Sequence, residues 1–549
     1  MRAELTRAPA LLTAVALAAL LCACSKNPEP AAAPAEPASA AASAASAAPT
    51  AMAQASAHDG INWVKAKTEA DVDGAFEQAK ASGKPLFLYW GAVWCPPCNQ
   101  VKATIFPRAD FIERSAAFVP VYIDGDTPGA QKLGARFKVR GYPTMILFRP
   151  DGAEITRLPG EVDAQKYLKV LALGLEASRP VKMALDAALK DPKSVKPADW
   201  RLLASYSWET DDDQLVSEKE RGALLRKLAA ATPASEAEAQ TTLLLKAAAL
   251  GGKPSDKAML ARLNEVLADE TLARAQADIL VNFHREIVSA LTAPKSAQRA
   301  KLLKAYDDRL GSLQTDSLLS RLDRLTALDA RVQLARLDDP NAALSQALLQ
   351  QVRDEAARAD AEITTPEERQ AAMPTAADAL SHAGLLDESD TLLKAQLPKS
   401  HSPYYFMLQL ASNAKKRGDK EAALQWYERA YAESKGPATR LQWGTTYVNA
   451  LLELAPQDEE RIERAAASVI GEMKGQPDAF EQRNAARLAR MDKALAKWNG
   501  AGVHTAALER VRTQIGEVCA QLPAQDEQRS ACEALAGGKP AAKSPGTSA

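Results

Sequence analysis

The aromatic residues of this chain are distributed so unevenly that we expect two kinds of domain. Phe, Trp and Tyr crowd between residues 61 and 178, where short apolar runs alternate with turn residues. Beyond Pro180, amphipathic stretches rich in Ala and Leu are separated by Pro or Gly, a pattern that predicts consecutive helices. With 549 residues, the chain also exceeds the size at which a single hydrophobic core stops growing. We therefore predict a small α/β domain followed by a long all-α domain.

The overall charge argues against one class of partner. The 68 basic and 69 acidic residues leave a net charge of -1. Such a chain has no global positive field that would attract nucleic acid. We expect no nucleic-acid partner.

Residues 1–23 have the pattern of a signal peptide, with a basic start and an apolar core over residues 11–21. The segment Leu21-Cys22-Ala23-Cys24 resembles the lipobox of bacterial lipoproteins. This resemblance implies that Cys24 becomes the lipidated first residue, and Ser25 resembles the sorting signal for the outer membrane of Gram-negative bacteria. The alternative is an ordinary secretory signal that happens to contain two cysteines.

Residues 24–58 consist mainly of Ala, Pro and Ser. A segment with so few large apolar side chains cannot offset its ordering entropy by burial, so we predict a disordered tether. The tail at 537–549 has a similar composition and the same prediction. Together with the lipobox, the tether predicts a lipid-anchored protein of the cell envelope that faces the oxidising periplasm.

The segment 59–178 is predicted to form a sheet flanked by helices. Its apolar and aromatic runs are short enough for buried strands, and helical stretches with turn residues at their ends lie between them. The predicted strands are 86–90, 118–124, 144–149 and 154–158, and the predicted helices are 69–82, 99–105, 129–139 and 163–175.

The segment Trp94-Cys95-Pro96-Pro97-Cys98 falls between a predicted strand and a predicted helix. In this context a Cys-x-x-Cys pair indicates redox chemistry rather than zinc. A zinc site would need a second ligand pair, but the other paired cysteines outside the signal lie hundreds of residues away. The five histidines are scattered singly: His58, His284, His382, His401 and His504. We expect no metal and no cofactor, and a static structural disulfide remains the alternative.

The motif and a second segment, Gly141-Tyr142-Pro143-Thr144, together resemble the thioredoxin superfamily. The approach to the first strand, Ala79 to Pro85, is most similar to the C-terminal domain of DsbD-type reductases. The resemblance covers about a fifth of the chain and implies a thioredoxin fold, with a central mixed sheet flanked by helices. It also implies that Pro143 is the cis-proline of the family.

The resemblance implies a role for each motif residue. Cys95, just before a helix N-terminus that favours the thiolate, would be the attacking nucleophile. Cys98 would resolve the mixed disulfide, and Trp94 would shield the pair from water. Pro97, directly before Cys98, is the further family residue of the motif. The backbone at Tyr142 and Pro143 would bind an extended substrate segment by strand-like pairing.

The sequence departs from the thioredoxin pattern at two positions near the motif. Tyr89 occupies the position of the family's buried acid, and Pro120 replaces that acid's lysine partner. Proton transfer to Cys98 must then use another route, such as water or Glu161. The pair Pro96-Pro97 also removes two backbone donors, which predicts a smaller lowering of the Cys95 pKa and a more reducing couple.

The region 179–536 is predicted to be helical and in part similar to tetratricopeptide repeats. Gly384 and Gly418 lie 34 residues apart, which is the period of that repeat, and small and aromatic residues follow at matching offsets. Unrelated helical hairpins with coincidental turn glycines are the alternative. A concave repeat surface is a candidate site for a protein partner. Its aromatic residues, which at helical spacing more often form core, are Trp426, Tyr427, Tyr431, Trp443 and Tyr447.

Cys519 and Cys532 lie in the last helical segments. In an oxidising compartment we expect them to form a structural disulfide that joins two antiparallel helices. A second redox pair is the less favoured interpretation.

The sequence as a whole favours a thiol–disulfide oxidoreductase that reduces disulfides in protein substrates and takes electrons from an upstream thiol donor. The rival hypothesis is an interaction scaffold, in which the helical array binds partners and the thioredoxin-like fold is a docking module.

Overall fold

The computed structural model describes residues 60–139, 141–160, 163–211, 214–251 and 256–537. The expectations for the signal peptide, Cys24, the tether, Glu161 and the tail beyond Gly537 lie outside the described residues.

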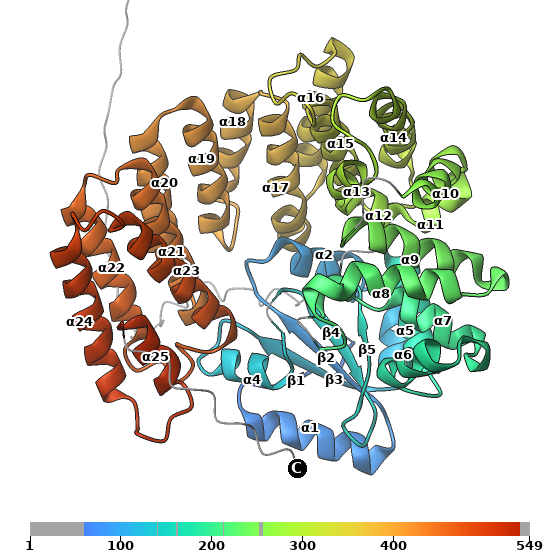
Figure 1. Ribbon diagram of the computed structural model, residues 1–549, viewed down its shortest axis with the longest axis horizontal. Helices are drawn as coiled ribbons and strands as arrows, with labels where there is room; N and C mark the ends of the chain where they lie inside the picture. The colour runs from blue at the N-terminus through green and yellow to red at the C-terminus, as the bar shows by residue number, and fades with distance from the viewer. Residues whose placement is uncertain (1–59, 140, 161–162, 212–213, 252–255, 538–549) are drawn as a thin grey trace, which may run out of the picture. The chain divides into compact units, whose positions relative to one another are not determined.

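The small domain is built on a five-stranded mixed sheet with the order β1-β3-β2-β4-β5 (Figure 1). The strands are β1 (Val64–Lys65), β2 (Leu86–Gly91), β3 (Val119–Asp124), β4 (Thr144–Phe148) and β5 (Glu154–Leu158). Strand β2 is parallel to β3 and antiparallel to β4, which in turn is antiparallel to β5. All of β2 is buried, which explains why its sequence is an unbroken apolar run rather than an alternating one.

Both faces of the sheet are covered. The helices of this domain are α1 (Glu69–Ser82), α2 (Pro96–Thr104), α3 (Ala109–Ser115), α4 (Ala130–Arg136) and α5 (Ala164–Leu175). Phe87 and Tyr89 of β2 enter one hydrophobic cluster, and Leu86, Leu88 and Trp90 enter another, as the two-residue period of a strand requires. The predicted thioredoxin fold is confirmed, although β1 and α3 had no signal in the sequence because both are short.

The rest of the described chain is helical, as predicted. Its elements are α6 (Val181–Lys190), η1 (Pro192–Ser194), α7 (Pro197–Ser205), η2 (Trp208–Thr210), α8 (Glu218–Ala231), η3 (Ala234–Glu236), α9 (Ala237–Ala249), α10 (Lys257–Ala268), α11 (Glu270–Ala275), α12 (Ala277–Asn282), α13 (His284–Leu291), α14 (Ala297–Thr315), α15 (Arg321–Ala335), α16 (Gln346–Glu362), α17 (Pro366–His382), α18 (Leu386–Gln396), α19 (Pro403–Arg417), α20 (Lys420–Glu433), α21 (Pro437–Leu454), α22 (Glu459–Met473), α23 (Gln482–Trp498), α24 (Thr505–Gln521) and α25 (Arg529–Leu535). Sequential neighbours such as α8 and α9, α19 and α20, and α21 and α22 pack together. Among the described residues, no helix combines the length and apolar character needed to span a membrane.

Two turns between these helices require glycine. Gly384 follows α17 with φ 83°, and Gly418 follows α19 with φ 80°, a conformation that other residues rarely adopt. In the helices that come next, Ser389 and Ala423 are fully buried. The pairs α17 with α18 and α19 with α20 therefore form helical hairpins. Their assignment to the tetratricopeptide repeat stays a prediction.

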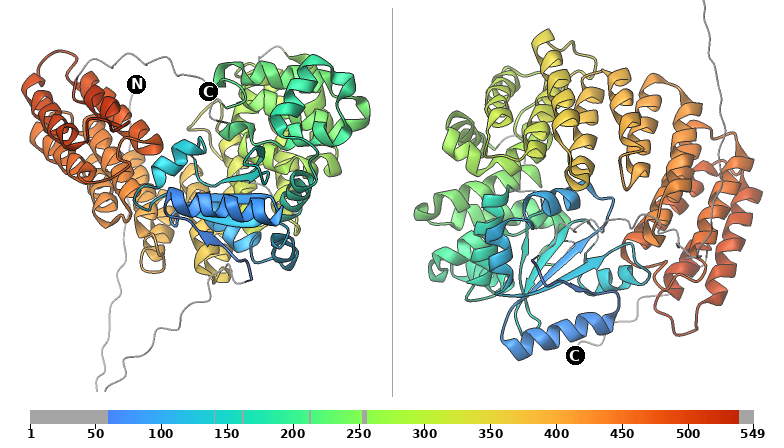
Figure 2. Two further views of the ribbon diagram at one scale, coloured as in Figure 1. Left: turned by 90° about the horizontal axis from the view of Figure 1, so that it is seen from below. Right: turned by 180° about the vertical axis from the view of Figure 1, so that it is seen from behind.

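Helices from distant parts of the chain contact the small domain. Helix α6 packs on β5 and α7 on α5, whereas α17 packs on α2 and α23 on α4. Figure 2 shows from two further directions that the sheet lies beside both early and late helices of this region. The small domain therefore shares its surface with helices from more than 300 residues of sequence.

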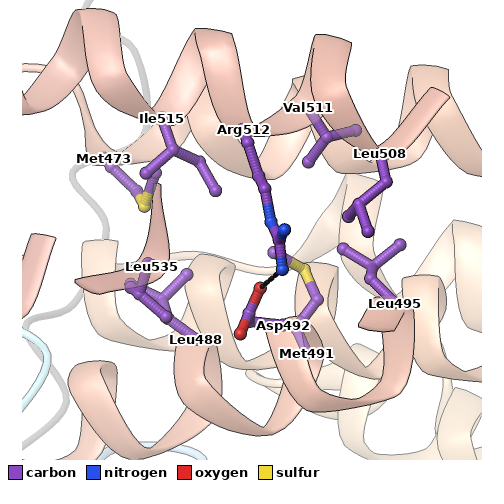
Figure 3. A pocket seen from close by; sticks show the side chains of 10 residues that line it. All are labelled: Met473, Leu488, Met491, Asp492, Leu495, Leu508, Val511, Arg512, Ile515 and Leu535. Carbon is purple, nitrogen blue, oxygen red and sulfur yellow. Dashed lines mark ion pairs between the residues drawn. The ribbon is translucent and has the colours of Figure 1, made fainter. Parts of the chain in front are cut away.

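At the end of the described chain, Cys519 of α24 and Cys532 of α25 form a disulfide. Beside it lies an apolar space of about 10 Å³, lined by residues of α22 to α25 that include Leu488 and Ile515 (Figure 3). This volume is no larger than one water requires, and the lining is apolar except for the ion pair between Asp492 and Arg512. The space is therefore a packing gap rather than a ligand site.

Replacing both Cys519 and Cys532 with Ser should destabilise α24 and α25 by about 3 kcal/mol, the value expected for a closed loop of this size. Hydrogen exchange of the amides in α24 measures the free energy of local opening. Wild-type protein treated with a reductant is the matched control and should behave like the double variant. Unchanged exchange in α24 would contradict a stabilising role.

Candidate redox site

Cys95 and Cys98 form a disulfide at the N-terminus of α2. Cys95 is the N-cap residue, and the prolines at the first two helical positions have no N–H to leave unsatisfied. The backbone N–H of Cys98 donates to Cys95 Sγ at 3.2 Å. One donor to the Cys95 sulfur thus remains despite the two prolines, and in the reduced protein it would favour the thiolate.

The Tyr142–Pro143 peptide bond is cis and lies at the same edge of the sheet as the disulfide. Thr144, the next residue, pairs with Trp90 at the end of β2, the strand that leads to Cys95. The ring of Tyr142 stacks on Trp90 at 5.8 Å and meets the ring of Trp94 edge-on at 5.8 Å. The two motifs recognised in the sequence therefore come together in space.

The helical region encloses the disulfide. Cys98 is 0% exposed, Cys95 2% and Trp94 6%. The three residues belong to one hydrophobic cluster with apolar residues of α19 and α21, among them Met407 and Trp443. The sequence predicted a shield from Trp94, but it had no signal for a cover from residues some 300 positions later.

The Trp94 ring is the centre of these contacts. It stacks on Tyr405 of α19 at 5.9 Å and packs edge-to-face on Trp443 of α21 at 5.5 Å. The guanidinium of Arg483 on α23 lies 5.5 Å from the Trp94 ring and 4.9 Å from that of Tyr142. Cation–π contacts of this kind are strongest where water is excluded.

Side chains of the helical region also hold the backbone just before Cys95. Gln370 Nε2 on α17 donates to Trp94 O at 3.1 Å, and Ser400 Oγ donates to Gln370 Oε1 at 2.6 Å. His401 Nε2 donates to Val93 O at 3.1 Å. The approach to the nucleophile is thereby fixed by both domains. Sequence reasoning did not identify Gln370 or His401, because neither stands in a local motif.

Asp126 is another residue whose place at the site the sequence did not reveal. Its Oδ2 accepts from Trp94 Nε1 at 2.8 Å and from Thr439 Oγ1 of α21 at 2.5 Å. Burial, with a smaller contribution from the nearby Asp124, raises the pKa of Asp126 to about 6 against the lowering effect of the two hydrogen bonds. The available signal was its position, since Asp124 ends strand β3 and Asp126 lies two residues beyond it.

Tyr89 has no acid–base role at neutral pH. Its side chain is fully buried, and burial raises the pKa of its phenol far above the ordinary value. Its ring packs on Phe106 and Tyr122 instead. Within the parts of the chain that the structure describes, no cluster of His, Cys, Asp and Glu could hold a metal ion.

Comparison with known proteins agrees with this geometry. The profile of the thioredoxin-like domain family matches residues 72–174. A thioredoxin of Mycolicibacterium smegmatis is 31% identical over 106 residues, which are 19% of this chain and 92% of that protein. A thiol:disulfide interchange protein DsbD of Pseudomonas fluorescens is 32% identical over 118 residues, 21% of this chain and 20% of the relative. A solution structure of a thioredoxin from Thermus thermophilus has 26% identity and a TM-score of 0.19, covering 21% of this chain and 85% of that one.

Through this domain the chain belongs to the thioredoxin-like family. The pair Cys95 and Cys98 has the spacing of the redox motif of thiol–disulfide oxidoreductases. The chain spans about a fifth of the length of the DsbD relatives that it matches.

Replacing Asp126 with Asn should change stability in a pH-dependent way. Because the folded-state pKa is raised, the unfolded state releases this proton first, and the wild type loses stability as the pH rises from about 4 to about 6. The uncharged variant avoids that loss, so it should gain at most about 3 kcal/mol relative to the wild type above pH 6 and nothing below about pH 4.

Chemical unfolding at pH 4 and pH 8 measures the difference. Asp186→Asn, at an exposed carboxylate of α6, is the matched control and should show a much smaller pH dependence. A difference between Asp126→Asn and wild type that is equal at both pH values would contradict the burial of a titrating group.

Removing part of the cover should expose the dithiol. In the reduced protein, Trp443→Ala should speed alkylation of Cys95 by iodoacetamide roughly tenfold or more, the effect of losing about 1.4 kcal/mol of covering contacts. Trp498→Ala, which removes a tryptophan stacked on His504 instead, is the control and should leave the rate unchanged. Equal rates in both variants would show that α21 does not cover Cys95 in solution.

Proposed function

We propose that this protein reduces disulfide bonds in protein substrates through the Cys95–Cys98 dithiol. The observation that carries the proposal is the disulfide at the N-terminus of α2, at the same sheet edge as a cis-proline. The names of the relatives, thioredoxin and thiol:disulfide interchange protein, support the same reaction class.

The reaction begins with a reduced dithiol. The Cys95 thiolate attacks one sulfur of the substrate disulfide, forms a mixed disulfide and releases the other substrate sulfur as a thiolate, which takes a proton from water. Cys98 then loses its proton and attacks Cys95 Sγ. This step forms the Cys95–Cys98 disulfide and releases the second substrate thiol. Two electrons pass to the substrate, and an upstream dithiol donor must return them.

The geometry supports this division of roles. Cys95 accepts the Cys98 N–H and caps the helix, so its thiolate is the better stabilised of the two. Cys98 lies within the helix, as a resolving residue should. Trp94 and Pro97 shape the motif, and the backbone at Tyr142 and Pro143 would pair with the substrate.

The location of the protein belongs to the same proposal. Lipidation at Cys24 would attach the protein to a membrane, in keeping with a periplasm-facing position and with the outer membrane of a Gram-negative bacterium. An oxidising compartment also suits the disulfide between Cys519 and Cys532, which would serve as a structural link. Globomycin treatment of the host, which blocks lipoprotein processing, would change the membrane attachment if Cys24 is lipidated.

One observation favours the alternative function of an interaction scaffold. Cys95 is 2% exposed beneath the helical region, so a folded partner cannot touch its sulfur without a movement of the cover. In a scaffold the helical array would bind a partner and the thioredoxin-like fold would be a docking module.

Insulin reduction by the purified protein, with a dithiol as electron donor, separates the two functions. The reductase predicts turnover that disappears in Cys95→Ser, while Cys519→Ser with Cys532→Ser retains it. Turnover that is no greater than that of the Cys95→Ser variant would favour the scaffold. In the native host, Cys98→Ser should trap substrates as mixed disulfides on Cys95.

The direction of electron flow can be read from the reduction potential. We expect a reducing couple, nearer to the thioredoxin value of about -270 mV than to the DsbA value of about -120 mV. Equilibration with glutathione measures it. A value near that of DsbA would contradict the assignment as a reductase.

A further inference from the structure

Three cavities lie between the sheet domain and the first helices of the helical region. The first, of about 160 Å³, reaches the cis-proline edge and has Tyr142, Pro143 and Gly160 in one wall. Its other wall comes from the helical region and includes Glu209 and Lys246. This cavity therefore adjoins the redox site without belonging to the thioredoxin-like domain alone.

The other two cavities continue the first. A cavity of about 600 Å³ shares Pro159, Lys246 and Asp278 with it and runs between α5 and α9. A third, of about 900 Å³, shares Lys166 and Lys169 with the second and extends along α11 and α14. The shared residues show that the three cavities adjoin one another in a row from Pro143 along helix α5, and we call this row the α5 groove.

Ion pairs and hydrogen bonds across the two domains hold the groove open. Lys166 of α5 pairs with Asp278 of α12 at 2.5 Å and also donates to the carbonyl of Ala275 at 3.0 Å. Farther along, Asp163 pairs with Arg274 of α11 at 3.1 Å. Partly buried pairs of this kind fix the spacing of α5 from α11 and α12, so the groove is a preformed feature.

At the end near the cis-proline, the groove is lined by an ion pair between Glu209 and Lys246. Glu209 Oε2 has no hydrogen-bond partner among the described residues. Lys246, 5% exposed, donates to Tyr206 O at 2.7 Å, and its Nζ lies 3.5 Å from that Glu209 oxygen. The ion pair is long, so Glu209 Oε2 has room for a hydrogen bond of normal length, which a peptide N–H would supply. A peptide carbonyl would accept from a remaining donor of Lys246 Nζ.

Because the helical region covers Cys95, a substrate needs another approach to the redox site. Helices α17, α19 and α21 pack against Trp94 and the cysteines, so an approach from those helices is blocked. The groove reaches Pro143 beside η2, α9 and α12, which contribute no residue to that cluster. A thin extended chain fits such an approach, whereas a folded surface does not.

We propose that the α5 groove binds an extended polypeptide segment of the substrate and leads its cysteine to the edge at Pro143. The helical region is then a wall of the substrate site that selects flexible or unfolded chains. This inference rests on the proposed reductase function and names its substrate class. The groove mixes charges of both signs with Ala, Val and Thr side chains, which suits a peptide rather than a small ion.

Lys169→Trp tests the inference, since this exposed residue of α5 lines both larger cavities. The measured quantity is the turnover of insulin divided by the turnover of bis(hydroxyethyl) disulfide. We expect Lys169→Trp to lower this ratio by roughly tenfold or more, because bulk in the groove hinders a polypeptide but not a small disulfide. The matched control is Lys182→Trp, at an exposed lysine of α6 outside the groove, which should retain the wild-type ratio. An equal ratio in the two variants would overturn the inference.

A second measurement does not depend on turnover. A photoreactive benzoylphenylalanine at Ser235, an exposed position on the groove wall, should crosslink to reduced, carboxymethylated insulin B chain, and the same residue at position 182 should not. Equal crosslinking at both positions, or at neither, would overturn the inference. Absence of any Cys95-dependent turnover, with crosslinking confined to position 235, would contradict the reductase function and leave the groove as a peptide site.

Discussion

The packing of the Trp94 side chain is the interaction on which the rest of this structure depends. Its indole N–H binds Asp126, its ring packs on Tyr405 and Trp443, and its carbonyl accepts from Gln370. Because Trp94 directly precedes Cys95, these contacts between the domains also surround the nucleophile. A change in the packing of these helices would therefore alter the surroundings of the dithiol directly.

Two opposing effects act on the Cys95 sulfur in this enclosure. Apolar surroundings disfavour a thiolate, because a charge loses its hydration there. The N–H of Cys98 and the N-terminus of α2 favour it. The helical region adds to the apolar surroundings of Cys95 and leaves its hydrogen bond in place. We therefore expect the cover to influence the reduction potential of the dithiol as well as the access of substrates to Cys95. Access through the α5 groove would let an extended substrate meet the sulfur without complete loss of the cover.

Much of the small domain could be predicted because its signals are local. The buried run of β2 and the proline pair at the start of α2 each depend on neighbours within a few residues. Strand β1 and helix α3 were missed since they are too short to show a period. Gln370, Asp126 and Thr439 could not be predicted as neighbours of the site, because their contacts with it span tens to hundreds of residues.

The sequence by itself determined the redox pair and the helical character of the remainder, since helix periods and the Cys-x-x-Cys spacing are properties of short segments, and its resemblance to the thioredoxin superfamily implied the fold of the small domain. The tertiary structure alone decided that this remainder closes over the dithiol and forms one wall of a groove that ends at Pro143. The physical reason is that burial of the dithiol depends on which surfaces of the folded chain pack against it. Which surfaces meet is set by the summed packing of many helices, and no single segment encodes it.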